Sequence, residues 1–218
     1  MSLTNAKIST EEGLLIAACK LFSDKGYKDT TIAEISRTSE ANVAAVNYYF
    51  RDKATLYRKS AKRAFQITEK AFPLDIISVK EKSAEEKLKY FIETALSRVF
   101  ATGEEGYFSK IMLKELSEPT ETLDWIVEKI IIPKAKWLNL ILREIVGEDV
   151  SERTVSFCHM AIINQCMFFS VNKEIRKRLN IYPELNNQDV KELAETIYCF
   201  SINGLKGVMK YKHEHRKL

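Results

Sequence analysis

The stretch that decides the fold reads TTIAEISR at residues 30–37 and, after a short break, NVAAVNYYFRDK at residues 42–53. Thr31 followed three residues later by Glu34 is a capping-box pattern, which predicts that a short helix begins there. Residues 43–49 predict a second short helix after a break of four residues. Two short helices joined by a tight turn are typical of a helix-turn-helix motif.

Longer helices are expected on either side of this motif. Ser9 and Glu12 form another capping box, and Gly26 is placed to end the first helix in a left-handed conformation. Asp52 is expected to cap a long helix over residues 52–72. The first 72 residues therefore predict four helices, of which the middle two are very short.

The rest of the chain also has a helical pattern. Residues 73–82 resemble a linker. Longer helices are expected over residues 83–101, 105–117, 119–146, 151–178 and 187–211. Pro133 should kink or interrupt the third of these. Because only 7 Gly and 4 Pro occur among 218 residues, of which 45% are hydrophobic, the predicted fold class is all-α.

The positive charge is concentrated near the N-terminus. Residues 1–72 contain 12 Lys or Arg and 8 Asp or Glu, whereas residues 73–218 contain 22 of each. The whole formal net charge of +4 therefore lies in the first third of the chain. This is where a polyanion such as DNA would bind, although a few surface lysines can also fall there by chance.

The second helix of the motif offers small, amide and phenol side chains. Ala44 and Ala45 would let the backbone approach the floor of the major groove, and Asn42 and Asn47 can pair with base edges such as that of adenine. The residues expected to reach phosphates are Thr31, Tyr48, Tyr49 and Lys53. The full predicted DNA-binding set is Thr30, Thr31, Asn42, Val43, Ala44, Ala45, Asn47, Tyr48, Tyr49 and Lys53.

The other side of the same helix should be buried. Val46 and Phe50 are expected to face inward, onto Ile35 and Leu56. A run of three aromatics is more often core than surface. On a helix of two turns, however, the three rings at residues 48–50 cannot all be buried, so at least one must be exposed.

At these residues the chain resembles the TetR family of transcription regulators. The matching residues, within about residues 10–58, are Leu21, Phe22, Gly26, Tyr27, Thr30, Thr31, Ile32, Ile35, Tyr48, Phe50, Lys53 and Leu56. NVAAVNY at residues 42–48 looks like the CecR-like branch of that family. KELSEP at residues 114–119 and INQCMFF at residues 163–169 are similar to the C-terminal domain of that branch.

The chain also departs from the family pattern. The family usually has Gly in the turn of the motif, where this chain has Glu40. A left-handed backbone would cost a non-glycine residue about 1 kcal/mol there, so the turn could differ locally. Arg51 stands where a small residue is common and could add a phosphate contact, and Tyr49 replaces a frequent His. These changes affect which operator sequence would be bound.

The resemblance implies two functional domains. Residues 1–52 would form the three-helix DNA-binding domain, with a connecting helix over about residues 52–72, and residues 73–218 a helical bundle for effector binding and dimerisation. Partners would then be double-stranded operator DNA, a small hydrophobic effector and a second copy of the chain. Candidate pocket residues, each of which could instead be ordinary core, are Phe91, Phe100, Phe108, Met112, Trp125, Trp137, Gln165 and Phe168.

The sequence contains no motif typical of another class of function. The four cysteines at residues 19, 158, 166 and 199 are scattered, so no disulfide framework or metal site is expected. We also find no catalytic motif and no cofactor fingerprint, and thus expect neither an enzyme nor a cofactor. No signal peptide or apolar run of membrane-spanning length is present, which favours a cytoplasmic protein.

The leading hypothesis is a ligand-responsive transcriptional regulator, a repressor that its effector releases from the operator. The alternative is an effector-independent helical module that binds DNA or another partner. A small-molecule enzyme of all-α type is a distant third, because no catalytic constellation can be named.

Overall fold

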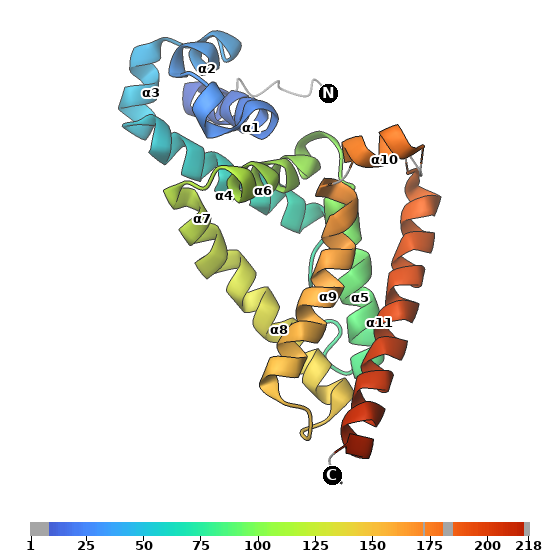
Figure 1. Ribbon diagram of the computed structural model, residues 1–218. Coiled ribbons are helices and arrows are strands. Elements are labelled where there is room, and N and C mark those ends of the chain that lie inside the picture. The colour runs from blue at the N-terminus through green and yellow to red at the C-terminus, as the bar shows by residue number, and fades with distance from the viewer. Residues whose placement is uncertain (1–8, 172, 181–184, 216–218) are drawn as a thin grey trace, which may run out of the picture. The chain divides into compact units, whose positions relative to one another are not determined.

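The computed structural model describes residues 9–171, 173–180 and 185–215, and in these ranges every regular element is a helix (Figure 1). The N-terminal helices are α1 (Thr10–Asp29), α2 (Ile32–Thr38), α3 (Val43–Phe50) and α4 (Lys53–Ala71). They are followed by α5 (Ala84–Val99), the short 3-10 helix η1 (Gly103–Gly106), α6 (Tyr107–Ser117), α7 (Glu121–Ile126) and the π-helix η2 (Val127–Ile131). The last helices are α8 (Ile132–Val146), α9 (Glu152–Val171), α10 (Lys173–Leu179) and α11 (Asn187–His215). The all-α prediction is confirmed.

The chain divides into two compact units. One contains the residues up to Ala71 together with Thr102–Trp125, and the other contains Phe72–Ala101 together with the residues from Ile126 onward. Helix α6 and all but the last residue of α7 therefore belong to the same unit as the N-terminal helices, whereas both were expected in the effector-binding domain. The predicted functional boundary near residue 73 remains a prediction.

The first unit has its own apolar core. Val46 and Phe50 on α3 are 0% and 1% exposed, and they lie in one cluster with Ile35 of α2 and Leu56 of α4. Leu14 and Phe22 of α1 and Ile111 of α6 complete this cluster. The predicted inward face of α3 is thus confirmed.

The second unit packs α5, α8, α9 and α11 side by side (Figure 1). Its largest fully buried side chains include Leu88, Ile92 and Leu96 on α5 and Leu138 on α8. Leu205 of α11 and Cys166 of α9 close the same core.

The helix starts follow local capping rules. The side chains of Ser9, Thr31 and Asn42 each accept a backbone N–H in the first turn of the helix that follows. Asp52 does the same for α4, since its Oδ1 accepts the Thr55 N–H at 2.7 Å. Ser83 and Glu86 cap α5 reciprocally, with both halves of the capping box present.

Pro133 lies at the start of α8, immediately after the π-helix η2. A proline inside a regular helix lacks the N–H donor and its ring meets the carbonyl of the residue four positions earlier. The wider π turn relieves this conflict, so residues 121–146 form three consecutive helical segments. The expected interruption is therefore present, one turn earlier than the proline itself.

The predicted single helix over residues 151–178 is wrong, because α9 ends at Val171 and α10 begins at Lys173. Arg176 of α10 turns back onto the last turn of α9, where its Nη2 donates to the Phe169 carbonyl at 2.9 Å. The guanidinium also lies over the Phe169 ring, 5.3 Å from its centroid.

Two non-glycine residues with positive φ flank α3. Glu40 has φ +55°, so the turn of the motif keeps its left-handed backbone without the glycine that the family usually has there. Arg51 has φ +73° and ψ −51°, and the Asp52 N–H donates to the Phe50 carbonyl at 2.8 Å across it. This is a γ-turn of the rare, strained form. A strained residue therefore lies near each end of α3.

Replacing Glu40 with Gly should stabilise the protein by about 0.5–1 kcal/mol. Relief of the left-handed backbone is worth about 1–2 kcal/mol, and the greater freedom of glycine in the unfolded chain offsets part of it. Thermal unfolding should show a midpoint raised by about 1–4 °C. Glu40→Ala is the matched control, because it removes the carboxylate but keeps the positive φ. An equal rise in both variants would mean that charge, not backbone strain, is responsible.

Candidate nucleic-acid interface

The outward face of α3 is fixed by the burial of its inward face. Because Val46 and Phe50 are held in the core, the residues on the opposite side of the helix must point away from it. Asn47 and Ala44 are exposed, Val43 is 46% exposed and Tyr48 is 82% exposed. The structure thus brings four of the predicted DNA-binding residues onto one surface.

Tyr49 and Ala45 contribute less to this surface. Both are partly buried and pack against the core cluster of the first unit. The Tyr48 and Tyr49 rings meet edge to face, with centroids 4.9 Å apart. The sequence-based argument that one ring of the aromatic run must be exposed is confirmed, and that ring is Tyr48.

Asn42 serves first as a helix cap. Its Oδ1 accepts the Ala44 N–H at 2.8 Å, which satisfies one of the free donors at the start of α3. The side-chain amide NH₂ remains available as a donor. A two-bond contact with adenine would need the same oxygen as an acceptor, so Asn47 is the better placed of the two amides.

Thr30 and Thr31 have opposite environments. Thr31 is exposed and caps α2, since its Oγ1 accepts the Glu34 N–H at 3.2 Å. Thr30 is 0% exposed, and its Oγ1 donates to the carbonyls of Gly26 at 2.8 Å and Leu21 at 3.3 Å. Thr30 was among the predicted DNA-binding residues, but its buried hydroxyl is bonded to carbonyls of α1, at whose C-terminal end it lies.

Lys53 is held by α1 before any DNA is present. Its Nζ lies 4.5 Å from the centroid of the Tyr27 ring and donates to the Lys28 carbonyl at 3.3 Å. Burial lowers the pKa of this ammonium from its ordinary value, against an opposing effect of Asp29. The ammonium has three donors, so two remain for a phosphate. Tyr27 is the residue of this arrangement that the sequence analysis missed, although it belongs to the quoted motif.

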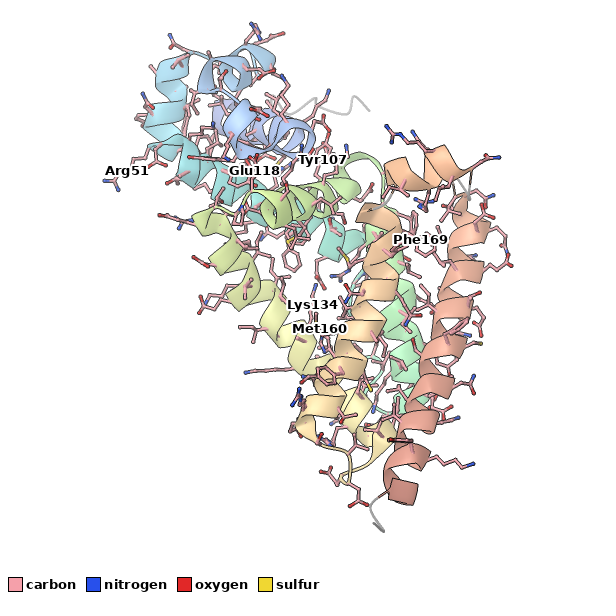
Figure 2. All side chains as sticks on the ribbon, viewed as in Figure 1. Arg51, Tyr107, Glu118, Lys134, Met160 and Phe169 are labelled. Carbon is pink, nitrogen blue, oxygen red and sulfur yellow. The ribbon has the colours of Figure 1, made fainter. Side chains whose placement is uncertain are left out.

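Arg51 adds an exposed cation at the end of α3. Figure 2 shows its side chain extending away from the helices at the strained turn. Glu40 and Asp52 place negative charges at the two ends of the same helix, and Asp52 is committed to capping α4. The charge pattern around α3 is thus mixed, with its cations at the junction of α3 and α4.

The predicted pocket residues do not converge within either unit. Phe91, Phe100 and Trp137 belong to the core of the second unit, where the centroids of the Phe91 and Trp137 rings are 6.1 Å apart. Phe108 and Trp125 pack on the core of the first unit, and Met112 is half-buried on α6.

Gln165 and Phe168 line an open groove of about 460 Å³ between α9 and α11. Its other lining residues are Ala161, Asn164, Phe169, Leu193, Thr196, Ile197 and Phe200. The groove is mostly apolar, and Phe200 at its edge is 73% exposed. An exposed apolar groove of this kind is typical of a surface that another apolar surface packs against.

Burial governs the protonation of two cysteine thiols and of the His159 imidazole. All four cysteines are free, and burial raises the pKa of Cys19 and of Cys166 to about 12, so these thiols stay protonated. Burial lowers the pKa of His159, whose Nδ1 lies 2.7 Å from Asn139 Oδ1. Among the described residues, no three His, Cys, Asp or Glu side chains gather to hold a metal ion.

None of the helices in the described ranges has the length and apolar character needed to cross a membrane.

Two family models match the chain. Residues 14–59 match the model described as bacterial regulatory proteins of the tetR family. Residues 84–205 match the model described as the C-terminal domain of the HTH-type transcriptional dual regulator CecR. The first match covers α2 and α3, which form the motif, together with parts of α1 and α4, and the second covers more than half of the chain.

Curated relatives are similar over shorter stretches. The probable HTH-type transcriptional regulator YttP of Bacillus subtilis (strain 168) is 28% identical over 91 residues, 42% of this chain and 44% of that protein. IcaR of Staphylococcus epidermidis, a negative transcriptional regulator of the biofilm operon icaADBC, is 40% identical over 48 residues, 22% of this chain and 26% of that protein. The chain matches less than half the length of either relative.

A solved structure is similar over most of the fold. The transcriptional regulator FadR from Bacillus subtilis, crystallised in complex with stearoyl-CoA, has a TM-score of 0.63 at 16% identity, over 88% of this chain and 97% of that one. At this identity the likeness shows the fold alone. Together with the match of both family models, the helix-turn-helix with its exposed α3 shows that the chain belongs to the TetR family of DNA-binding transcriptional regulators, with a C-terminal domain of the CecR type.

Proposed function

We propose that this regulator is a repressor that binds operator DNA as a homodimer and leaves it when a small hydrophobic effector binds. The observation that carries the DNA-binding part is the geometry of α3. Val46 and Phe50 are buried while Asn47 and Tyr48 are exposed, so a rigid helix presents polar and apolar groups to a major groove.

The exposed side chains suit a mixed reading of bases and backbone. Val43 and Ala44 offer apolar contact to a thymine methyl, and Asn47 offers an amide that matches adenine. Tyr48 and Lys53 reach phosphates and fix the register of the helix without reading sequence.

Two features support a homodimer: the small size of a single helix-turn-helix motif and the exposed apolar residues of the second unit. One helix-turn-helix buries too little surface for tight operator binding, whereas a dimer reads two half-sites one helical turn apart. Phe157, Met160 and Phe168 on α9 and Phe200 on α11 are each more than half exposed. A second copy laid against these helices would bury such side chains by two-fold symmetry.

The effector and the repression are supported by relatives. The FadR structure named above contains stearoyl-CoA, and IcaR is a negative regulator. The mechanism we propose is a shift between two dimer states with different separations of the two α3 helices. An effector that binds the state with mismatched spacing lowers DNA affinity.

The test is binding of the purified protein to the DNA upstream of its own gene at physiological salt. Fluorescence anisotropy should show affinity at least about 10³-fold higher than for a random duplex. A panel of fatty acids and acyl-CoA compounds of increasing chain length is then added to the complex. Equal affinity for both duplexes contradicts the operator-binding part, whereas tight binding that no compound reverses favours the effector-independent alternative.

Replacing Asn47 with Ala should relax sequence preference at one base position of each half-site. The loss of a good two-bond contact to one base is worth about 1–3 kcal/mol at that position. Binding to a library of single-base operator variants, compared with the unchanged protein, measures it. A uniform loss over all library members would instead assign Asn47 to the backbone.

Replacing Lys53 with Ala should weaken binding to all sequences alike. Removal of one phosphate contact lowers the slope of log affinity against log salt by about one. Lys70→Ala is the matched control, because Lys70 is exposed near the far end of the same helix, about 25 Å away. An unchanged salt slope for Lys53→Ala would exclude the phosphate contact.

A further inference from the structure

The last turn of α1 is set apart from the rest of the helix by Gly26. The backbone of Gly26 is not helical, with φ +84°, and its carbonyl accepts the Thr30 hydroxyl at 2.8 Å. Residues 27–29 therefore form a separate final turn, which contains the Tyr27 ring and the Lys28 carbonyl. The C-terminal end of a helix carries a partial negative charge, so this turn is a favourable place for a cation.

Lys53, the first residue of α4, provides that cation. Its Nζ donates to the Lys28 carbonyl at 3.3 Å and lies over the Tyr27 ring, 4.5 Å from the centroid. An aromatic face attracts an ammonium that lies within about 6 Å of its centroid. Two different groups of α1 therefore hold the same ammonium, and both belong to the compact unit that contains α3.

The Tyr27 ring is itself fixed by the core of this unit. Its centroid lies 5.2 Å from that of Tyr57 and 6.4 Å from that of Phe22. Those two neighbours are 1% and 0% exposed, whereas Tyr27 is only partly buried. Aromatic pairs at such distances stabilise the packing beyond the burial of the rings. The Tyr27 ring thus connects a close-packed core to a cation at the junction of α3 and α4.

The contacts of Lys53 differ from those of another cation on the same helix. Arg63 of α4 pairs with the Glu12 carboxylate at 2.7 Å, so an opposite charge lies directly against it. Lys53 instead contacts a ring and a carbonyl, which carry no formal charge. Asp29 acts on Lys53 through space, by opposing the fall in its pKa that burial causes. The Lys53 charge is therefore positioned and remains available to an anion.

We infer that Tyr27 is a positioning residue for DNA binding, whose ring holds the Lys53 ammonium where it meets a phosphate. The inference rests on the proposed phosphate contact of Lys53. Fixing a long side chain costs conformational freedom, and a lysine that is already held loses less of it when DNA binds. Only the face of the ring is needed, so the Tyr27 hydroxyl takes no part.

The experiment replaces Tyr27 in the full-length protein, alone and together with Lys53→Ala. Tyr27→Leu keeps an apolar side chain against the core but removes the ring, whereas Tyr27→Phe keeps the ring and removes the hydroxyl. Fluorescence anisotropy measures affinity for the upstream DNA and for a random duplex over a range of salt concentrations.

Tyr107→Leu is the matched control. Tyr107, labelled in Figure 2, is also a partly buried tyrosine, and the Lys110 ammonium lies 5.8 Å from the centroid of its ring. Both residues are on α6, a helix for which no DNA contact is proposed. This variant therefore removes a similar ring and a similar contact without affecting Lys53.

Tyr27→Leu should lower affinity for both duplexes by about 2- to 12-fold, the typical cost of ordering one long side chain at an interface. Tyr27→Phe should recover most of this loss, and Tyr107→Leu should cause none. The loss should disappear in the Lys53→Ala background, because the side chain that the ring positions is then absent. Equal losses with and without Lys53 would assign Tyr27 to the stability of the fold alone and overturn the inference. A gain in affinity would also overturn it, since the ring would then withhold Lys53 from DNA.

A second measurement does not depend on the folding of Tyr27→Leu. Protons that lie over the face of an aromatic ring resonate upfield of their usual position. In NMR spectra of the unchanged protein, the CH₂ protons next to the Lys53 ammonium should show this shift, both free and bound to the upstream DNA. An ordinary position in either state would mean that Tyr27 does not hold the ammonium there, and the inference would be wrong.

Two outcomes separate the inference from the proposed function. If Lys53→Ala weakens binding while Tyr27→Leu has no effect, the inference fails and the phosphate contact stands. If Lys53→Ala changes neither affinity nor the salt slope, the phosphate contact fails and the inference falls with it.

Discussion

The burial of Val46 and Phe50 against Ile35 and Leu56 is the interaction on which the rest of this structure depends. A helix of eight residues is not stable alone in water, because the cost of its first turn is not recovered over so short a length. Each fully buried apolar side chain contributes about 1.5–3 kcal/mol, which makes tertiary packing the main source of stability for α3. The same packing fixes the direction of Asn47 and Tyr48.

At both ends of α3, the free-energy cost of a strained backbone is offset by a hydrogen-bonded helix cap. Glu40 and Arg51 each hold a positive φ that costs a non-glycine residue about 1 kcal/mol or more. Asn42 and Asp52, next to them, each cap a helix, and a cap is typically worth about 1 kcal/mol. The cost of the strained backbone and the stabilisation by the caps are similar in size. The sharp turns that limit α3 to a short helix therefore have little net effect on the free energy of folding.

Helix α6 gives the N-terminal unit a component from the middle of the chain. Ile111 belongs to the core of that unit, and Lys114 covers Gly26, where an added Cβ would lie 3.2 Å from its side chain. Gly26 has φ +84° and ψ 179°, a backbone that is essentially confined to glycine. Helix α6, which comes from the middle of the chain, is therefore part of the packing of the N-terminal unit.

Local patterns in the sequence by themselves determined the all-helical class and the capped starts of the N-terminal helices, because a cap or an amphipathic period involves residues only three or four positions apart. Thr31, Asn42, Asp52 and the inward pair on α3 were all predictable for this reason. Only the tertiary structure decided which of two adjacent threonines is buried, that Lys53 lies on Tyr27, and that the pocket candidates divide between two units. The position of Lys53 depends on a segment 25 residues away in the chain, since its ammonium donates to the Lys28 carbonyl. A local sequence pattern does not reveal such contacts, because the burial of a side chain depends on which other segments of the folded chain pack against it.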